Sequence, residues 1–210
     1  MKKYTHSLIF LHGFSMEAKD MIYYSNKIDK ILPENIKFKY IFPQAYKKKI
    51  TCFDGEKDAA WYDYFTSNIK TEEEINEADL IKSRNRIHKL ILKEKTYHNN
   101  DTTKIFVGGY SQGCCQALDA GITFPEKLGG IIGFKGHIVN YTFNYIKIPQ
   151  FIWVIHGKKD DTISYNVSKT SYDKYNKKYI TFLSQNSDHE MHTGIKDQML
   201  SLNKWLLKRL

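Results

Sequence analysis

The segment from Lys104 to Leu118 constrains the fold more than any other part of this 210-residue chain. An apolar run, Ile105-Phe106-Val107, is followed by Gly109-Tyr110-Ser111-Gln112-Gly113 and then by Cys114-Cys115-Gln116-Ala117-Leu118. This order predicts a strand, a sharp turn and a helix, because glycines two residues before and after the serine leave room for close backbone approach. A strand that turns directly into a helix is typical of α/β folds.

The rest of the chain alternates short apolar runs with amphipathic stretches, which predicts a mainly parallel central sheet with helices on both faces. Two long amphipathic helices are predicted from Glu72 to Lys95 and from Gln198 to Leu210. The stretch from Pro43 to about Thr66 is predicted to be irregular, and a loop of that length often lines an active site. The predicted strands are residues 7–11, 38–42, 104–108, 130–134, 151–155 and 179–183.

Length and composition favour one folded unit, so we expect a single domain over residues 1–210. Hydrophobic residues make up 41% of the chain and the mean hydropathy is −0.52, which favours a soluble protein. No targeting segment is expected, since the first apolar run is too short for a signal peptide or a bilayer span. The cysteines, Cys52, Cys114 and Cys115, are few and lack metal-ligand spacing, so we expect a cytoplasmic protein without a bound metal.

The chain is basic, with a formal net charge of +9 and a pI near 9.2. Its lysines are scattered, and the triple Lys47-Lys48-Lys49 is interpreted as a solvated loop, so no nucleic-acid partner is expected. A basic surface is nevertheless attracted to anionic membranes or acidic substrates, at a strength that depends on salt. Transient contact with an anionic membrane surface is therefore a second expectation.

Reactive side chains follow several of the predicted strands, at the edge where the carboxyl ends of parallel strands meet. His12 follows the first strand, Ser111 follows the third, and the segment with Asp160 and Asp161 follows the fifth. The last strand is followed by a segment with His189 and His192. A serine, an aspartate and a histidine in this chain order are typical of the nucleophile, acid and base of α/β-hydrolases.

The chemistry of acyl transfer explains why each of these groups is needed. A serine hydroxyl is a weak nucleophile until an adjacent histidine takes its proton, and an aspartate holds that histidine in the right tautomer. A tetrahedral intermediate also needs hydrogen-bond donors, for which the backbone N–H groups of Gln112 and Phe14 are the candidates. His12 lies beside this donor position, where a structural hydrogen-bonding role is expected.

Several ordered motifs resemble the acyl-protein thioesterase, lysophospholipase and carboxylesterase family of small α/β-hydrolases, and they span nearly the whole chain. They are residues 9–13 (IFLHG), 42–45 (FPQA), 60–63 (AWYD), 108–113 (GGYSQG), 124–130 (FPEKLGG) and 156–160 (HGKKD). The resemblance implies an α/β-hydrolase, and the short chain leaves no room for a large separate lid domain. It further implies that Trp61 is a wall of the acyl pocket; a plain core tryptophan is the alternative.

The function that the resemblance implies is hydrolysis of an ester or thioester through an acyl-enzyme on Ser111, without a metal or an organic cofactor. The main candidates are an acyl-protein thioesterase, which would remove palmitoyl groups from proteins, and a carboxylesterase. A lysophospholipase of the same family and a catalytically inactive hydrolase-like binding protein are the alternatives. Acylated proteins, lysophospholipids and small esters are the corresponding substrates.

Two site assignments stay open, and three positions depart from the family pattern. Asp160 is preferred over Asp161 as the acid, and His189 over His192 as the base, each with the second residue as an alternative. The departures are Phe14-Ser15, where the family usually has leucine and glycine; Cys114-Cys115, interpreted as core packing; and Lys135, where the family tends to have serine. The Lys135 side chain is expected to point to water, with contact to an anionic substrate as the alternative.

Overall fold

A six-stranded parallel sheet forms the centre of the computed structural model, which describes residues 3–67, 71–72 and 74–210. The strand order is β2-β1-β5-β6-β7-β8, and every neighbouring pair is parallel. The predicted parallel sheet is therefore confirmed, and each strand lies within two residues of its predicted bounds. The strands are β1 (His6–Leu11), β2 (Phe38–Ile41), β5 (Ile105–Tyr110), β6 (Gly130–Phe134), β7 (Ile152–Gly157) and β8 (Ile180–Gln185).

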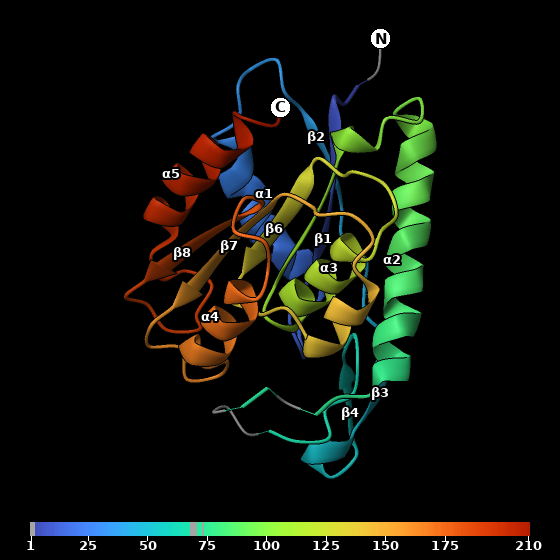
Figure 1. Ribbon diagram of the computed structural model, residues 1–210, viewed down its shortest axis with the longest axis vertical. Coiled ribbons are helices and arrows are strands. Elements are labelled where there is room, and N and C mark those ends of the chain that lie inside the picture. Colours follow the sequence, from blue (N-terminus) through green and yellow to red (C-terminus); the bar gives the residue numbers. More distant parts are fainter. Residues whose placement is uncertain (1–2, 68–70, 73) are drawn as a thin grey trace.

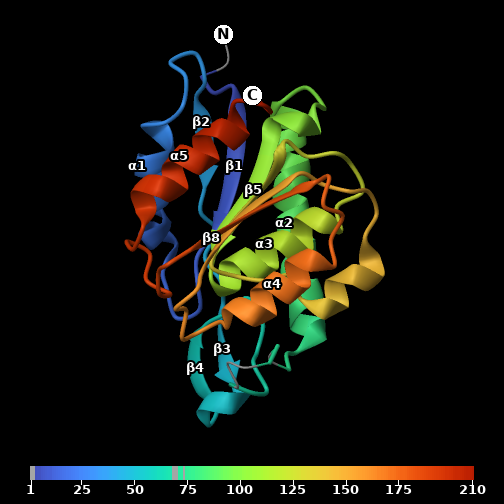
Figure 2. The same ribbon diagram turned by 60° about the vertical axis from the view of Figure 1, so that its left-hand side comes forward.

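Helices cover both faces of the sheet, as predicted (Figures 1 and 2). Helices α1 (Ile22–Asp29) and α5 (Ile195–Leu206) lie on one face. The other face carries α2 (Glu77–Tyr97), α3 (Gln112–Ile122) and α4 (Tyr165–Asp173). Short 3-10 helices are η1 (Ala18–Met21), η2 (Thr51–Phe53), η3 (Thr102–Lys104) and η4 (Asn140–Tyr145). Among the described residues, no helix combines the length and apolar character that crossing a membrane requires.

Helix α2 begins later than predicted. The predicted start was Glu72, whereas the helix starts at Glu77, because the Asn76 side chain accepts a hydrogen bond from the Asp79 N–H at 3.1 Å and caps the first turn. Residue 73, which the prediction included, lies outside the described residues. The closing helix α5 is displaced in the other direction. It occupies Ile195–Leu206, so it begins three residues and ends four residues before the predicted bounds, Gln198 and Leu210.

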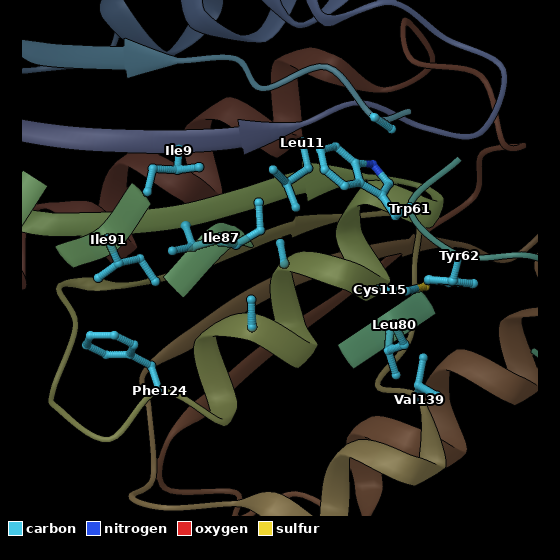
Figure 3. Packing of buried hydrophobic residues seen from close by; sticks show 14 of the residues in the cluster. Ile9, Leu11, Trp61, Tyr62, Leu80, Ile87, Ile91, Cys115, Phe124 and Val139 are labelled. Carbon is cyan, nitrogen blue, oxygen red and sulfur yellow. The ribbon is translucent and has the colours of Figure 1, made fainter. Parts of the chain in front are cut away.

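The core divides into layers on the two faces of the sheet, and β5 shows why. Ile105 and Val107 pack with α2 and α3, whereas Phe106 between them packs with α5, because successive side chains of a strand point to opposite faces. Figure 3 shows the first layer, in which Ile87 and Ile91 of α2 face the strands. Cys114 and Cys115 are fully buried in the core, which confirms their predicted packing role. Their small side chains let α3 lie close to the sheet.

A two-stranded antiparallel hairpin lies within the stretch that was predicted to be irregular. It pairs β3 (Lys47–Ile50) with β4 (Glu56–Ala59), at the carboxyl-terminal end of the parallel sheet (Figure 1). The sequence did not predict this hairpin, because its strands are mostly charged and only Ile50 and Ala59 are buried. The hairpin extends from the edge of the sheet at which Ser111 lies.

Candidate active site

Ser111 stands at a sharp turn between β5 and α3, where its backbone has a positive φ of 55° with a ψ of −125°. Non-glycine residues rarely occupy this region, and such strain is characteristic of functional turns. The two flanking glycines are required by space. A Cβ atom on Gly109 would lie 2.3 Å from the Gly113 carbonyl oxygen, and one on Gly113 would lie 2.3 Å from that of His12. The sequence pattern therefore has a steric cause.

A relay of hydrogen-bonding side chains leads away from Ser111. His189 Nε2 lies 2.9 Å from Ser111 Oγ, and His189 Nδ1 lies 2.8 Å from Asp160 Oδ2. Asp161, by contrast, is exposed at the turn after Asp160. His192 packs its ring 4.4 Å from that of Tyr23 in α1. Of the two open choices, the structure thus brings Asp160 and His189 together with Ser111.

The surroundings of the Asp160 carboxylate favour its ionised form. Its Oδ1 accepts hydrogen bonds from the N–H groups of Thr162 at 3.0 Å and Ile163 at 2.8 Å, and His156 Nε2 lies 3.2 Å from Oδ2. Burial on its own would raise the pKa of Asp160, but the hydrogen bonds to His156 and His189 outweigh it and hold this pKa well below its usual range.

His156 is a residue of this site to which the sequence reasoning gave no role. It is fully buried, with Nε2 2.7 Å from the Ile163 carbonyl oxygen and Nδ1 3.0 Å from Ser168 Oγ. It therefore fixes the loop around Asp160 in addition to contacting the carboxylate. Its position in the motif at residues 156–160 was a signal, but the motif alone does not say that the ring turns back onto Asp160.

Two backbone donors lie beside Ser111. The N–H groups of Phe14 and Gln112 donate no hydrogen bond within the described part of the chain. Gln112 is the first residue of α3, so its N–H points out of a helix N-terminus. Gly13 lies against the nucleophile, since a Cβ atom there would be 3.3 Å from Ser111 Cβ. Within the described residues, both predicted donors thus keep an N–H group without a hydrogen-bond acceptor in the segments next to Ser111.

Trp61 does not line the cavity at Ser111, in contrast to its predicted role as a pocket wall. Its side chain is 1% exposed and packs in the core beside Leu11 (Figure 3). The indole N–H donates to the His12 carbonyl at 2.8 Å, and the Trp61 N–H donates to Gln112 Oε1 at 2.9 Å. The alternative of a core tryptophan fits these contacts, through which Trp61 ties the loop after β4 to the turn at Ser111.

His12 has the structural role that was expected. Its Nε2 accepts a hydrogen bond from the Ala45 N–H at 2.9 Å, and its Nδ1–H donates to the Gly13 carbonyl at 2.7 Å. Burial lowers the pKa of His12, which favours this neutral tautomer. His12 therefore joins the loop after β1 to the loop after β2.

A cavity of about 270 Å³ opens beside Ser111. Aromatic rings form much of its wall: Phe14 stacks on Phe53 with ring centroids 5.6 Å apart and meets Tyr64 edge-on at 5.9 Å. The stretch between residues 43 and 66, which was expected to have a function, thus supplies part of the wall. The full lining is Phe14, Cys52, Phe53, Tyr64, Thr66, Ser67, Ser111, Asp161, Thr162 and Ile163.

Lys135 was expected to point to water, and this prediction is wrong. The residue is fully buried, and its Nζ donates to the carbonyl oxygens of Asp188 at 2.8 Å and Glu190 at 2.5 Å. Burial lowers the pKa of Lys135. The segment that carries His189 lies over the end of β6, and it covers the lysine while supplying carbonyl partners.

The fold and this arrangement define a class of protein: a serine hydrolase with the α/β-hydrolase fold. Comparison with known proteins agrees. The chain belongs to the phospholipase/carboxylesterase family, whose model matches residues 1–210.

Two curated relatives and one solved structure illustrate the similarity. The chain is 34% identical over 137 residues to acyl-protein thioesterase 1 of Schizosaccharomyces pombe; the match covers 64% of this chain and 57% of that protein, little more than half its length. It is 29% identical over 179 residues to acyl-protein thioesterase 1 of Yarrowia lipolytica, covering 81% of this chain and 76% of that protein. The crystal structure of Arabidopsis thaliana SOBER1 superimposes with a TM-score of 0.80 at 16% identity, covering 97% of this chain and 98% of that one.

Proposed function

We propose that Ser111, His189 and Asp160 are the nucleophile, base and acid of an acyl-enzyme mechanism that hydrolyses esters or thioesters. The observation that carries this proposal is the unbroken relay from Ser111 Oγ through His189 to Asp160, with contacts of 2.9 and 2.8 Å. Both distances fall in the range over which a general base takes a proton. The residue order and the strained turn at Ser111 support the same roles.

The proposed reaction has two halves. Ser111 Oγ attacks the acyl carbonyl while His189 takes its proton, and the N–H groups of Phe14 and Gln112 bind the resulting oxyanion. His189 then protonates the departing thiol or alcohol, which leaves an acyl ester on Ser111. Water, deprotonated by His189, releases the carboxylic acid and restores the serine. No step draws on a metal or an organic cofactor.

An S-acylated protein is the substrate that we propose first, and carboxylesters and lysophospholipids are the other candidates. Two relatives bear the name acyl-protein thioesterase, and the family bears the name phospholipase/carboxylesterase. The rings of Phe14, Phe53 and Tyr64 beside Ser111 suit an apolar acyl chain. All three substrate classes follow the same two half-reactions, so the leaving group distinguishes them.

A fluorophosphonate probe tests the mechanism, because it reacts with an activated serine. We expect the wild-type protein to be labelled and Ser111→Ala to remain unlabelled while keeping the same circular dichroism spectrum. Absence of labelling in properly folded wild-type protein would identify a hydrolase-like binding protein instead. The intact relay argues against that alternative.

A panel of three substrates tests the acyl and leaving groups separately. Turnover of p-nitrophenyl esters of increasing chain length reports the depth of the acyl cavity. A palmitoyl-cysteine peptide and lysophosphatidylcholine then report the leaving group at a fixed long chain. We expect the highest kcat/KM for the thioester peptide; a strong preference for the shortest esters contradicts the thioesterase assignment.

We also propose that the protein makes transient contact with anionic membrane surfaces and works in the cytoplasm. The β3–β4 hairpin beside the cavity exposes Lys47, Lys49 and Lys57, together with Phe53, which is 42% exposed. Each exposed lysine near an anionic surface contributes about 1 kcal/mol. Co-sedimentation with phosphatidylserine vesicles at rising salt tests the contact, and equal binding to neutral vesicles contradicts it. The three cysteines, all present as thiols, suit a reducing compartment.

A further inference from the structure

Lys135, the residue directly after β6, combines a strained backbone with a buried charged group. Its φ is 55°, in the left-handed region that non-glycine residues rarely adopt, and its side chain is fully buried. Burying an ammonium group and holding a left-handed backbone both cost free energy. A feature that is unfavourable in two ways points to a function at this position.

The Lys135 ammonium group forms hydrogen bonds to the segment that carries His189. Its Nζ donates to the carbonyl oxygens on both sides of that histidine, at Asp188 and Glu190. The carbonyl of His189 itself accepts a hydrogen bond of 2.5 Å from the Tyr110 hydroxyl. Three successive carbonyl groups are therefore held by two side chains.

The backbone that carries Lys135 is packed against the nucleophile. The Ser111 N–H donates to the Phe134 carbonyl at 2.9 Å, and the Lys135 N–H donates to the Ile155 carbonyl at 2.8 Å. A Cβ atom on Gly136 would lie 2.7 Å from Cys114 Cβ and 3.0 Å from the Ser111 carbonyl oxygen. This segment is thus fixed relative to Ser111, while the Lys135 side chain reaches to the base.

We propose that Lys135 is a positioning residue, which sets the distance and direction of His189 relative to Ser111 by holding the carbonyl groups on either side of it. This inference rests on the proposed role of His189 as the base. Lys135 is absent from the lining of the cavity at Ser111, so it acts on the step that uses the base and leaves substrate binding unchanged.

The experiment compares Lys135→Met, which keeps most of the side-chain length and removes the charge and the donors, with wild type. We expect kcat to fall about 10- to 100-fold, because displacing a reacting group by about 1 Å has effects of that size. KM should stay within about twofold. Lys135→Arg, which keeps the charge and the donors, should recover most of kcat.

Lys159→Met is the matched control, since this lysine is exposed next to Asp160, and the substitution is expected to leave kcat unchanged. Lys135→Gly relieves the left-handed backbone strain, so it tests the lost contacts even where the methionine variant folds poorly. It should show the same loss of kcat at full thermal stability.

Wild-type kcat in both Lys135→Met and Lys135→Gly overturns the proposal. A loss of kcat that follows thermal stability, with a matching change in KM and no recovery in the arginine variant, also overturns it, because Lys135 would then serve only the fold. Misfolding of both variants counts against it for the same reason. Retained activity in His189→Ala instead overturns the proposed base, so the two failures are distinguishable.

Discussion

Two clusters of serine, histidine and carboxylate lie at opposite ends of the same sheet. At the carboxyl end, Ser111 contacts His189, and His189 contacts Asp160. At the amino end, Ser7 Oγ lies 2.9 Å from His98 Nε2 and donates a hydrogen bond of 2.7 Å to Glu94 Oε2. The two clusters have the same kinds of side chain but differ in how these side chains are connected.

The order in which the three side chains are hydrogen-bonded decides what each serine can do. At Ser111 the carboxylate lies behind the histidine, so the ring can take the hydroxyl proton and the resulting charge is stabilised. The Ser7 hydroxyl donates its hydrogen bond directly to Glu94, so His98 does not lie between the serine and the carboxylate. The Ser7 cluster is consequently a structural bridge from β1 to α2.

Backbone and exposure separate the two serines further. Ser7 lies in β1, paired with Lys39 and Ile105 on its two sides, and is fully buried. Ser111 sits on the strained turn with φ 55°, is 8% exposed and lines the cavity. The two serines therefore share their neighbouring residue types but differ in backbone conformation and in access to the cavity.

The largest expected difference separates the two serines. Ser111→Ala should lower kcat by on the order of a million-fold and abolish fluorophosphonate labelling, because the nucleophile is lost. Ser7→Ala should retain activity within about threefold while losing stability, since a buried hydrogen bond to a charged group is removed. Steady-state kinetics and thermal melts of both variants measure this. Comparable losses of kcat in the two variants would contradict the distinction.

The histidines provide the next contrast. His189→Ala should lower kcat by about 100,000-fold with little change in KM, because the general base is removed. His192→Ala should remain near wild type, since this ring packs on Tyr23 and is not part of the relay. Kinetics of the two single variants decide between them. Small and equal losses would leave neither residue as the base.

The carboxylates differ in what they stabilise. Asp160→Asn should reduce kcat by about 10,000-fold, because the amide no longer holds His189 in the required tautomer. Glu94→Gln should instead lower thermal stability, since Glu94 also pairs with Lys39 at 2.8 Å, and it should leave kcat within about threefold. Paired measurements of kcat and melting temperature test both. An active Asp160→Asn enzyme would break the proposed relay.

The sequence predicted the sheet and the sharp turn at Ser111 well, and physical reasons explain this. Strands buried on both faces are short apolar runs, so β1, β5, β6 and β7 are visible in the sequence. The turn at Ser111 needs glycines for steric reasons that leave a readable pattern. The β3–β4 hairpin leaves no such pattern, because cross-strand hydrogen bonds hold mostly charged residues in place.

The parts of the site that the sequence did not reveal depend on which distant residues the long side chains contact. A tryptophan suits a pocket wall or a core equally, and the contacts of Trp61 with His12 and Gln112 decide for the core. A lysine after a strand usually reaches water, but the segment that carries His189 covers Lys135 and offers it carbonyl groups. Such outcomes depend on residues that lie 49 to 55 positions away along the chain.

The smallest expected effect is one that both ends of the sheet share. The pKa of His137, near the site, is lowered from 6.5 to about 4, and so is the pKa of His6 at the opposite end of the sheet. Burial is the leading cause in both cases. The unfolded chain then binds protons between pH 6.5 and 4 that the folded protein does not, so the free energy of unfolding is highest above this window and falls within it.

For His137 the fall amounts to about 2 kcal/mol between pH 7 and pH 5, since each pH unit below the unfolded-state pKa of 6.5 corresponds to about 1.4 kcal/mol. Urea unfolding at pH 7 and pH 5 measures it, and His137→Gln should lessen the pH dependence by about that amount because the titrating ring is gone. An unfolding free energy that depends on pH as steeply in His137→Gln as in wild type would contradict this contribution. In that case the acid sensitivity would come from the amino end of the sheet, and the two ends would differ in stability as well as in chemistry.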